Sequence, residues 1–377
     1  MTIISSIIFI VLAFALSIDS GIAQPVIHTP DTSKPLNDRW SWALAEAKTK
    51  QLGKSFWIGY SIDRLMGERS YIGSFYSDMR RNTPTLGELL TGMKPDDRID
   101  DRTSHGFSSM DGNFSFDDED KPERKVIKEV GILVHVSDTD GNHIDELKVS
   151  NLSLHVDLED APLLWLGSAD HPQSVSFLES IFSESKLREV KKHLIMAIGL
   201  HDESKNAISF LQRTLQGSEN SEVREEAAFW LGQTDTDEAR KTLLETVQSD
   251  ESARVREKAV FALSQMRGEE STDALITIAK SHRDRETRKK AAFWLGQKAS
   301  EKAVGALKEL AYKDEDTEVQ KSALFALTQI HGGDSVTELI KIARTHPNPK
   351  IRKQAIFWLG QSEDPKALDA LIEIIRR

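Results

Sequence analysis

The sequence predicts a mainly α-helical fold, in which a C-terminal α-solenoid of about seven helical hairpins follows a smaller N-terminal α+β domain. Three observations support this prediction. A block of the same pattern recurs every 32 residues in the second half of the chain, a second helical stripe separates its copies, and the first half has strand-like alternation instead. We expect a signal peptide at 1–23, the N-terminal domain at 24–157 and the solenoid at 158–377.

Composition excludes several classes of protein. The chain has 377 residues, of which 39% are hydrophobic, enough for a large buried core. It has no cysteine, which excludes disulfides, thiolate metal sites, cysteine nucleophiles and lipid-modified cysteines. The formal charge of −11 argues against a nucleic-acid partner, because phosphate binding needs a clustered excess of Lys and Arg.

The first segment is typical of an export signal. Residues from Ile3 to Ile18 are almost continuously apolar, and the small residues Gly21 and Ala23 fit a cleavage site before Gln24. No Lys or Arg precedes the run, so an uncleaved N-terminal membrane anchor is the alternative, although a bilayer span needs about 20 apolar residues. We expect cleaved export, to the periplasm if the source is bacterial, and no stable membrane span after cleavage.

Residues 24–157 predict a small domain with strands. A helix is expected from Leu36 to Lys50, and a strand at 55–61. The Asp-rich segment at 96–123 has no apolar periodicity and predicts a mobile acidic loop. Strand-like alternation then returns at Lys125–Val136 and Leu147–Leu158. Such a domain could cover the open end of the solenoid, since terminal repeats need a cap.

The repeat block is best seen at Val223–Gln233, which reads VREEAAFWLGQ. Its copies follow at a constant spacing of 32 residues, at Val255–Gln265, Thr287–Gln297, Val319–Gln329 and Ile351–Gln361. Two weaker copies precede it, at Val190–Leu200 and, truncated, at Ala161–Ser168. These copies define seven units.

Each unit also contains a second helix. In the last unit Leu368, Leu371, Ile372 and Ile375 recur at helical spacing, and Asp364 before Pro365 is typical of a helix start, as is Asn348 before Pro349. Neither helix of a unit could bury its apolar stripe alone. Successive hairpins must therefore stack into a solenoid.

The pattern of Val-Arg, a small apolar position, Ala-Leu or Trp-Leu-Gly and a following Leu-rich helix resembles HEAT-like repeats of the bacterial type, also known from phycobilisome-lyase-related proteins. The resemblance extends over residues 158–377. It implies a curved scaffold that binds other proteins. It does not imply one activity, because a fold hosts many functions.

Tryptophan and alanine alternate at one position of successive units. The row reads Trp165, Ala197, Trp230, Ala262, Trp294, Ala326 and Trp358. On a helical wheel this position belongs to the buried stripe, so we interpret the alternation as large and small side chains filling a close-packed interior. The neighbouring Gly232, Gly296 and Gly360 would permit either close helix approach or a left-handed helix end.

A phenylalanine column is the candidate binding surface. One residue before the tryptophan row, five units carry a ring that lies outside the buried stripe: Phe229, Phe261, Phe293, Phe325 and Phe357. One turn later each has a glutamine: Gln233, Gln265, Gln297, Gln329 and Gln361. The rings could form an exposed apolar strip for a partner, or each could be buried against the next repeat.

An arginine ladder forms a further row. Arg224, Arg256, Arg288 and Arg352 share one position, with Lys191 and Gln320 as variants, and Asp250, Asp284, Asp316 and Glu318 lie in nearby turns. Ion pairs that close the turns are the simpler interpretation. A groove for an anionic ligand is the alternative.

Motifs for catalysis or cofactor binding are missing. Asp138–Asn142 starts like a calcium loop but lacks its glycine and its glutamate, so we interpret it as a hairpin turn. No histidine is followed by glutamate, whereas the iron-binding HEAT hydroxylases use repeated His-Glu pairs. His201-Asp202-Glu203 comes close, and we expect a solvated loop there. We therefore expect no metal, no cofactor and no enzyme.

The function that follows is an exported scaffold or adaptor that binds a protein or peptide partner through the phenylalanine column and its glutamines. The alternative is an enzyme or small-ligand binder whose site lies in the N-terminal domain or at its junction with the solenoid. The sequence does not predict an oligomeric state.

Overall fold

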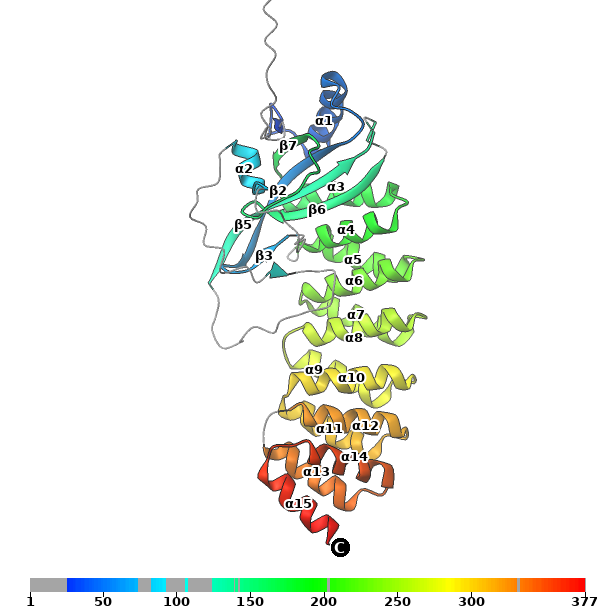
Figure 1. The fold of residues 1–377 in the computed structure, drawn as a ribbon. Coiled ribbons are helices and arrows are strands. Elements are labelled where there is room, and N and C mark those ends of the chain that lie inside the picture. Colours follow the sequence, from blue (N-terminus) through cyan, green and yellow to red (C-terminus); the bar gives the residue numbers. More distant parts are fainter. Residues whose placement is uncertain are drawn as a thin grey trace, which may run out of the picture.

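The chain folds into a sheet-containing N-terminal region at one end of a long stack of helices (Figure 1). This computed structural model describes residues 26–73, 83–92, 106–107, 124–138, 140–141, 143–201, 204–330 and 333–376. The signal peptide predicted at 1–23 lies outside the described residues. So does the acidic loop predicted at 96–123, apart from Gly106–Phe107, which form a short strand, β4.

A five-stranded sheet organises the N-terminal region, in the order β1-β7-β2-β5-β6. Its strands are β1 (Val26–His28), β2 (Phe56–Gly67), β5 (Lys125–Val136), β6 (Ile144–Asn151) and β7 (Leu163–Ser168). Strands β2, β5 and β6 are antiparallel, whereas β7 runs parallel to both β1 and β2. A separate parallel pair joins β3 (Tyr71–Ile72) to β4.

Both faces of the sheet are covered, which explains why its strands are apolar at both parities. On one face Phe56, Ile58 and Tyr60 are buried in the same core as residues of α1 (Leu36–Lys50) and α3 (His171–Glu184). On the other face Trp57 and Leu133 pack with residues of α2 (Leu86–Thr91). The predicted helix at 36–50 and strand at 125–136 are confirmed, and β5 and β6 form the predicted hairpin around 138–142.

For this region one prediction is confirmed only in part and another is wrong. The strand expected at 147–158 ends at Asn151, because the side chain of Asn151 accepts from the Ile72 amide at 2.6 Å and donates to the Glu129 carbonyl at 3.1 Å as the chain turns. The segment at 161–168, expected to be a truncated repeat, is strand β7, with Trp165 packed in the sheet. A short apolar run does not distinguish a strand from a helix. The helical array therefore begins at α3.

The array consists of helical hairpins stacked along one direction (Figure 1). Its helices after α3 are α4 (Arg188–Gly199), α5 (Lys205–Gly217), α6 (Ser221–Gln233), α7 (Asp237–Ser249), α8 (Ala253–Gln265), α9 (Glu269–Ser281), α10 (Arg285–Lys298), α11 (Glu301–Lys313), α12 (Thr317–Thr328), α13 (Gly333–Thr345), α14 (Pro349–Gly360) and α15 (Pro365–Ile375). We call the odd-numbered members A-helices and the even-numbered members B-helices. The described residues thus hold six hairpins followed by α15, close to the seven units expected.

The predicted helix starts are confirmed. Asn348 accepts from the Lys350 amide at 3.0 Å and Asp364 from the Lys366 amide at 2.8 Å, each with proline at the first helical position. These side chains satisfy amides that would otherwise lack an acceptor.

The alternation of tryptophan and alanine sets unequal spacings between B-helices. A Cβ added at Gly232 would lie only 2.8 Å from the Cβ of Ala262, so α6 approaches α8 closely. In the same way, a Cβ added at Gly296 would lie 2.9 Å from the Cβ of Ala326, so α10 approaches α12 closely. The wider gap between α8 and α10 holds the Trp294 ring of α10, which contacts Phe261 of α8 at a centroid distance of 5.0 Å. Large and small side chains therefore alternate as predicted, and the glycines serve close approach.

The core runs without interruption from the sheet into the array. Buried residues from Phe56 in β2 to Ala367 in α15 belong to one connected hydrophobic cluster. Helix α4 packs on strand β6 and α3 packs on α1, so the sheet covers the first hairpin, as a cap is expected to do. Within the described ranges no helix is both long and apolar enough to cross a membrane.

Candidate binding surface

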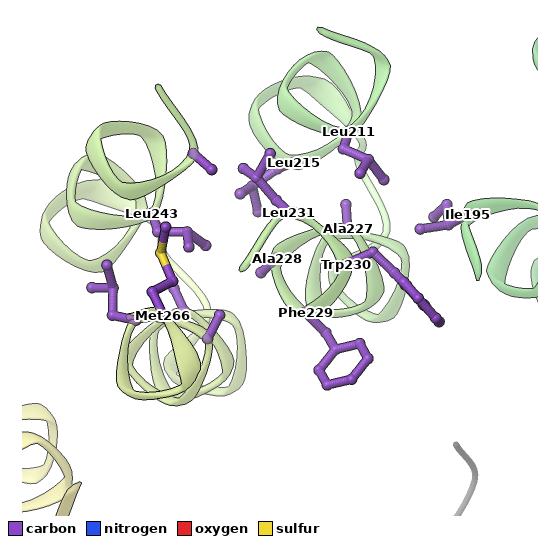
Figure 2. Close-up of a cluster of buried hydrophobic side chains, with 14 of the residues drawn as sticks. Ile195, Leu211, Leu215, Ala227, Ala228, Phe229, Trp230, Leu231, Leu243 and Met266 are labelled. Atoms are coloured by element: carbon purple, nitrogen blue, oxygen red, sulfur yellow. The ribbon is translucent and has the colours of Figure 1, made fainter. Parts of the chain in front are cut away.

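The phenylalanine column lies on the B-helices, one ring per helix. Each phenylalanine is the ninth residue of its helix, from Phe229 in α6 to Phe357 in α14. In Figure 2 Ala227 and Leu231 face the helix carrying Leu211, whereas Phe229 points away from it, although the Phe229 ring is still buried in the same hydrophobic core. Trp230, the next residue, extends toward the helix that carries Ile195.

Exposure of the rings rises along the column. Phe229 is 7% exposed, Phe261, Phe293 and Phe325 are half-buried, and Phe357 is 53% exposed. The rings are therefore neither a uniformly buried row nor a fully open strip. The C-terminal half of the column presents aromatic surface to solvent.

The rings and the tryptophans form contiguous aromatic groups. Phe229 stacks parallel to Phe261 with centroids 6.2 Å apart, and Phe261 contacts Trp294 at 5.0 Å. Farther along, Trp358 contacts Phe325 at 5.3 Å and Phe357 at 5.0 Å. Such contacts hold the rings in place, so little side-chain freedom would remain to be lost on binding.

The glutamines flank the column with graded exposure as well. Gln233 and Gln265 are half-buried, and Gln297, Gln329 and Gln361 are exposed. Two of them are oriented by the residue before: Gln265 donates to the Ser264 hydroxyl at 3.1 Å and Gln329 to the Thr328 hydroxyl at 3.2 Å. Amide groups beside the exposed rings are suited to hydrogen bonding with a peptide.

Charged side chains also border the column. The Lys258 ammonium lies 5.8 Å from the ring centroids of both Phe229 and Phe261, within range of a cation–π contact. Arg254 pairs with Glu225 across neighbouring B-helices at 3.2 Å, and Lys290 pairs with Glu257. The surface therefore combines rings with salt bridges at its edges.

The arginine ladder is mainly structural. Arg224 holds Asp250 of the next turn by two bonds, of 2.8 and 3.0 Å, and Arg288 holds Asp314 by two bonds of 3.1 Å. Arg256 reaches Asp284 at 3.3 Å. The ion-pair interpretation is confirmed for these three arginines. Hydrogen bonds from Thr287 and Arg256 lower the pKa of Asp284 to about 2, so it stays charged.

A buried polar chain at the junction of sheet and array was missed from the sequence. The Tyr60 hydroxyl lies 2.8 Å from the Ser174 hydroxyl, which lies 3.0 Å from Nε2 of His201, and the two Nδ1 atoms of His201 and His171 are 2.6 Å apart. Burial, with smaller contributions from the neighbouring His171 and Arg64, lowers the pKa of His201 to about 3. Burial also raises the pKa of Tyr60.

The hydrogen-bonded series from Tyr60 to His171 corrects the expectation of a solvated loop at 201–203. His201 is fully buried, and 202–203 lie outside the described residues. Only spatial proximity links Tyr60 to His201, so no local motif could have revealed the contact. In the ranges that the structure covers, no group of three or more His, Asp or Glu side chains is placed to hold a metal ion.

Comparison with known proteins identifies the array. The family profile for HEAT repeats matches residues 208–285 and 272–338, and the profile for the PBS lyase HEAT-like repeat matches 351–376. Among solved structures, the complex of CpcE and CpcF of phycocyanin lyase from Nostoc sp. PCC7120 is similar with 20% identity and a TM-score of 0.32, over 42% of this chain and 100% of that chain. Human deoxyhypusine hydroxylase is similar with 20% identity and a TM-score of 0.24, over 54% of this chain and 78% of that one. No curated protein matches the chain.

The family matches correct one expectation. We expected no enzyme because no catalytic motif was found, but residues 351–376 match a repeat that takes its name from a lyase. Residues 351–376 match this repeat although they contain none of the short catalytic motifs that we sought in the sequence. The absence of such motifs therefore does not argue against an enzymatic role. Residues 208–338 of the array therefore match HEAT repeats, and its last unit, at 351–376, matches the PBS lyase HEAT-like repeat.

Proposed function

We propose that this chain is a scaffold or adaptor that holds a protein or peptide partner along the phenylalanine column. The observation that carries the proposal is the 53% exposure of Phe357, with half-buried rings behind it on α8, α10 and α12. Packing of the core does not require an aromatic ring at this position, because the buried stripe of the same helix is already formed by Ile351, Ala355 and Leu359. An exposed, pre-positioned ring is suited to anchoring a partner.

Charge near the exposed end indicates the chemistry of the partner. Lys350 and Lys353 are exposed and lie two turns and one turn before Phe357 on the same face of α14. A segment that presents an apolar side chain next to acidic residues would match this surface. The exposed Gln361, one turn after the ring, supplies hydrogen-bonding groups to the backbone of such a segment.

Affinity capture tests the proposal. Three forms of the chain are compared as bait: the native chain, Phe357→Glu and, as a matched control, Leu368→Glu, which changes an apolar residue that is 62% exposed on α15. The partner should be retained by the native chain and the control but lost from Phe357→Glu. A partner recovered equally with all three folded baits would exclude the column as its binding site.

We also propose that the chain acts after export, on the strength of the apolar run from Ile3 to Ile18, with the periplasm as its location in a bacterium. N-terminal sequencing of the protein from its source tests this. A mature N-terminus near Gln24 is expected, whereas a retained Met1 in the membrane fraction would favour the anchor.

A lyase role is the second candidate function, and the match of residues 351–376 to the PBS lyase HEAT-like repeat favours it. In that case the surface would hold the protein on which the lyase acts. Incubation of the purified chain with phycocyanin apoprotein and free phycobilin tests this candidate. A covalent, coloured adduct formed only when the chain is present is the expected result, and adduct formation at the same rate without the chain would exclude it.

A further inference from the structure

The arginine ladder follows a pairing rule along the array. The fourth residue of each B-helix faces two side chains of the next turn, the C-cap of the next A-helix and the N-cap of the next B-helix. In the next turn Arg224 pairs with Asp250, Arg256 with Asp284 and Arg288 with Asp314, whereas the side-chain amide of Gln320 accepts from that of Asn348 at 3.5 Å. Each of these three arginines thus has an aspartate, and the neutral Gln320 has a neutral partner.

Among the described residues the two end positions of the ladder lack such an aspartate: Arg352 donates to the backbone carbonyls of His346 and Pro347, and the first position is a lysine. Lys191, the fourth residue of α4, faces Ser218 and Asn220, which are the C-cap of α5 and the N-cap of α6. In the part of the chain that the structure describes, no salt bridge to Lys191 is formed, and its ammonium lies over the Phe182 ring at 4.8 Å. Within the described ranges the Lys191 ammonium therefore lacks the aspartate partner that Arg224, Arg256 and Arg288 each have.

A groove occupies the same place. It has a volume of about 660 Å³, and Lys191, Ser218 and Asn220 line it together with the rings of Phe182 and Phe210. Its charged lining consists of four cations, Lys186, Arg188, Lys191 and Arg213, and two carboxylates, Glu179 and Glu219, of which Glu179 pairs with Arg213. Helix α4 begins at its edge, and the N-cap residue Leu187 offers no side-chain acceptor to the first amides. An uncapped helix start adds positive potential to that of the lysines.

We propose that this groove binds a carboxylate side chain of an acidic peptide segment, which takes the position relative to Lys191 that Asp250 takes relative to Arg224. Two features favour a peptide over a free anion. The lining includes two aromatic rings, which suit the apolar neighbours of an acidic residue, and the array binds aspartate side chains at equivalent turns. The site is distinct from the phenylalanine column and does not depend on it.

Substitutions in the chain itself test, without any ligand, whether Lys191 lacks a carboxylate partner. Lys191→Gln should leave the thermal unfolding midpoint nearly unchanged. Arg288→Gln should lower it by about 2 °C or more, because the loss of the guanidinium leaves the buried Asp314 carboxylate without its ion-pair partner. Ser218→Asp should raise the midpoint in the native background and not in Lys191→Gln. A large loss on Lys191→Gln, or the same effect of Ser218→Asp in both backgrounds, would overturn the proposal.

A peptide probe tests binding directly. Fluorescein-labelled Gly-Leu-Asp-Asp-Leu and its Asn-Asn counterpart are titrated with the full chain by fluorescence anisotropy. The Asp peptide should bind at least about tenfold more tightly at low salt, and Lys191→Gln and Ser218→Asp should each remove that preference. Lys353→Gln, an exposed lysine on α14, is the control and should retain it. Equal affinity for both peptides, a preference that survives Lys191→Gln, or equally tight binding of acetate or phosphate would overturn the assignment.

Discussion

The adjacent phenylalanine and tryptophan of a repeat unit point in different directions, and their exposure comes to differ along the array: Phe229 and Trp230 are both buried, whereas Phe357 is exposed and Trp358 is half-buried. Trp230 is buried between B-helices, whereas the ring of Phe357 is 53% exposed. Neighbouring residues of a helix point about 100° apart, so one enters the space between helices and the other leaves it. The sequence predicts this division because the phenylalanine position falls outside the Val-Ala-Leu stripe. It does not predict the rise in exposure along the column, which depends on what covers each ring.

This difference predicts opposite consequences of truncation. Trp230→Ala should lower the free energy of unfolding by about 3–5 kcal/mol, because it leaves a cavity against α4. Phe357→Ala should cost about 1 kcal/mol or less, since its ring is largely in solvent. Urea unfolding of the two variants measures both. Equal losses of stability would mean that the exposed ring serves packing.

The pH dependence of stability should report on His201. Its pKa is lowered to about 3 in the folded chain, whereas an unfolded histidine has its usual pKa of 6.5. Between these values the unfolded state binds more protons, so stability is retained above about pH 6.5 and is lost as the pH falls toward 3, by up to about 1.4 kcal/mol per pH unit.

The comparison for this effect is His201→Gln. The difference in unfolding free energy between the native chain and this variant should be constant above pH 7 and should shrink below pH 6. A difference that does not change between pH 7 and pH 5 would show that His201 is not held neutral by burial.

At the scale of helices, the spacing of the array depends on small residues. Gly296 faces Ala326 with no room for a side chain, whereas a Cβ at the equivalent Gly360 would meet nothing within 4 Å. Gly296→Ala should therefore force α10 and α12 apart and lower the free energy of unfolding by about 1–3 kcal/mol. Gly360→Ala is the matched control and should be neutral or slightly stabilising. Equal effects in thermal melts would contradict the close-approach account.

Elements with a long periodic pattern were predictable and short ones were not. The B-helices from α6 to α14 follow from a block whose Val, Ala and Leu recur at helical spacing, and the starts of α14 and α15 follow from Asn348 and Asp364. Strand β7 could not be separated from a repeat, because LLWLGS resembles the Trp-Leu-Gly end of the block. What distinguishes it is pairing with β1 and β2, which are remote in the sequence.

The candidate surfaces were predictable to different degrees. The phenylalanine column could be read from a single position of the repeat, and so could the arginine ladder. The lack of a carboxylate partner for Lys191 could not be predicted in this way. It becomes evident only when the ends of α5 and α6 are known, because they define which residues lie opposite Lys191 in the next turn. The chain from Tyr60 to His201 joins two regions that share no pattern, so its residues had to be seen together.

At the scale of the molecule, the two ends of the array differ. The first hairpin is covered by the sheet, whereas α15 exposes Leu368, Ile372 and Ile375. Each repeat is stabilised mainly by its neighbours, so opening should start at the end with fewer of them. Hydrogen exchange should be fastest in α15, slower in α13 and α14, and slowest from α3 to α10. Fast exchange in α3 and α4 would mean that the sheet does not act as a cap.

The most direct measurement of partner binding by the column is site-specific photo-crosslinking. The photoreactive analogue p-benzoylphenylalanine replaces Phe357, which it resembles in shape, or Thr277, an exposed residue of the A-helix α9. After irradiation in extract of the source, the account predicts a discrete crosslinked partner at position 357 and none of that mass at 277. A partner captured from Thr277 alone, or equally from both positions, would contradict it.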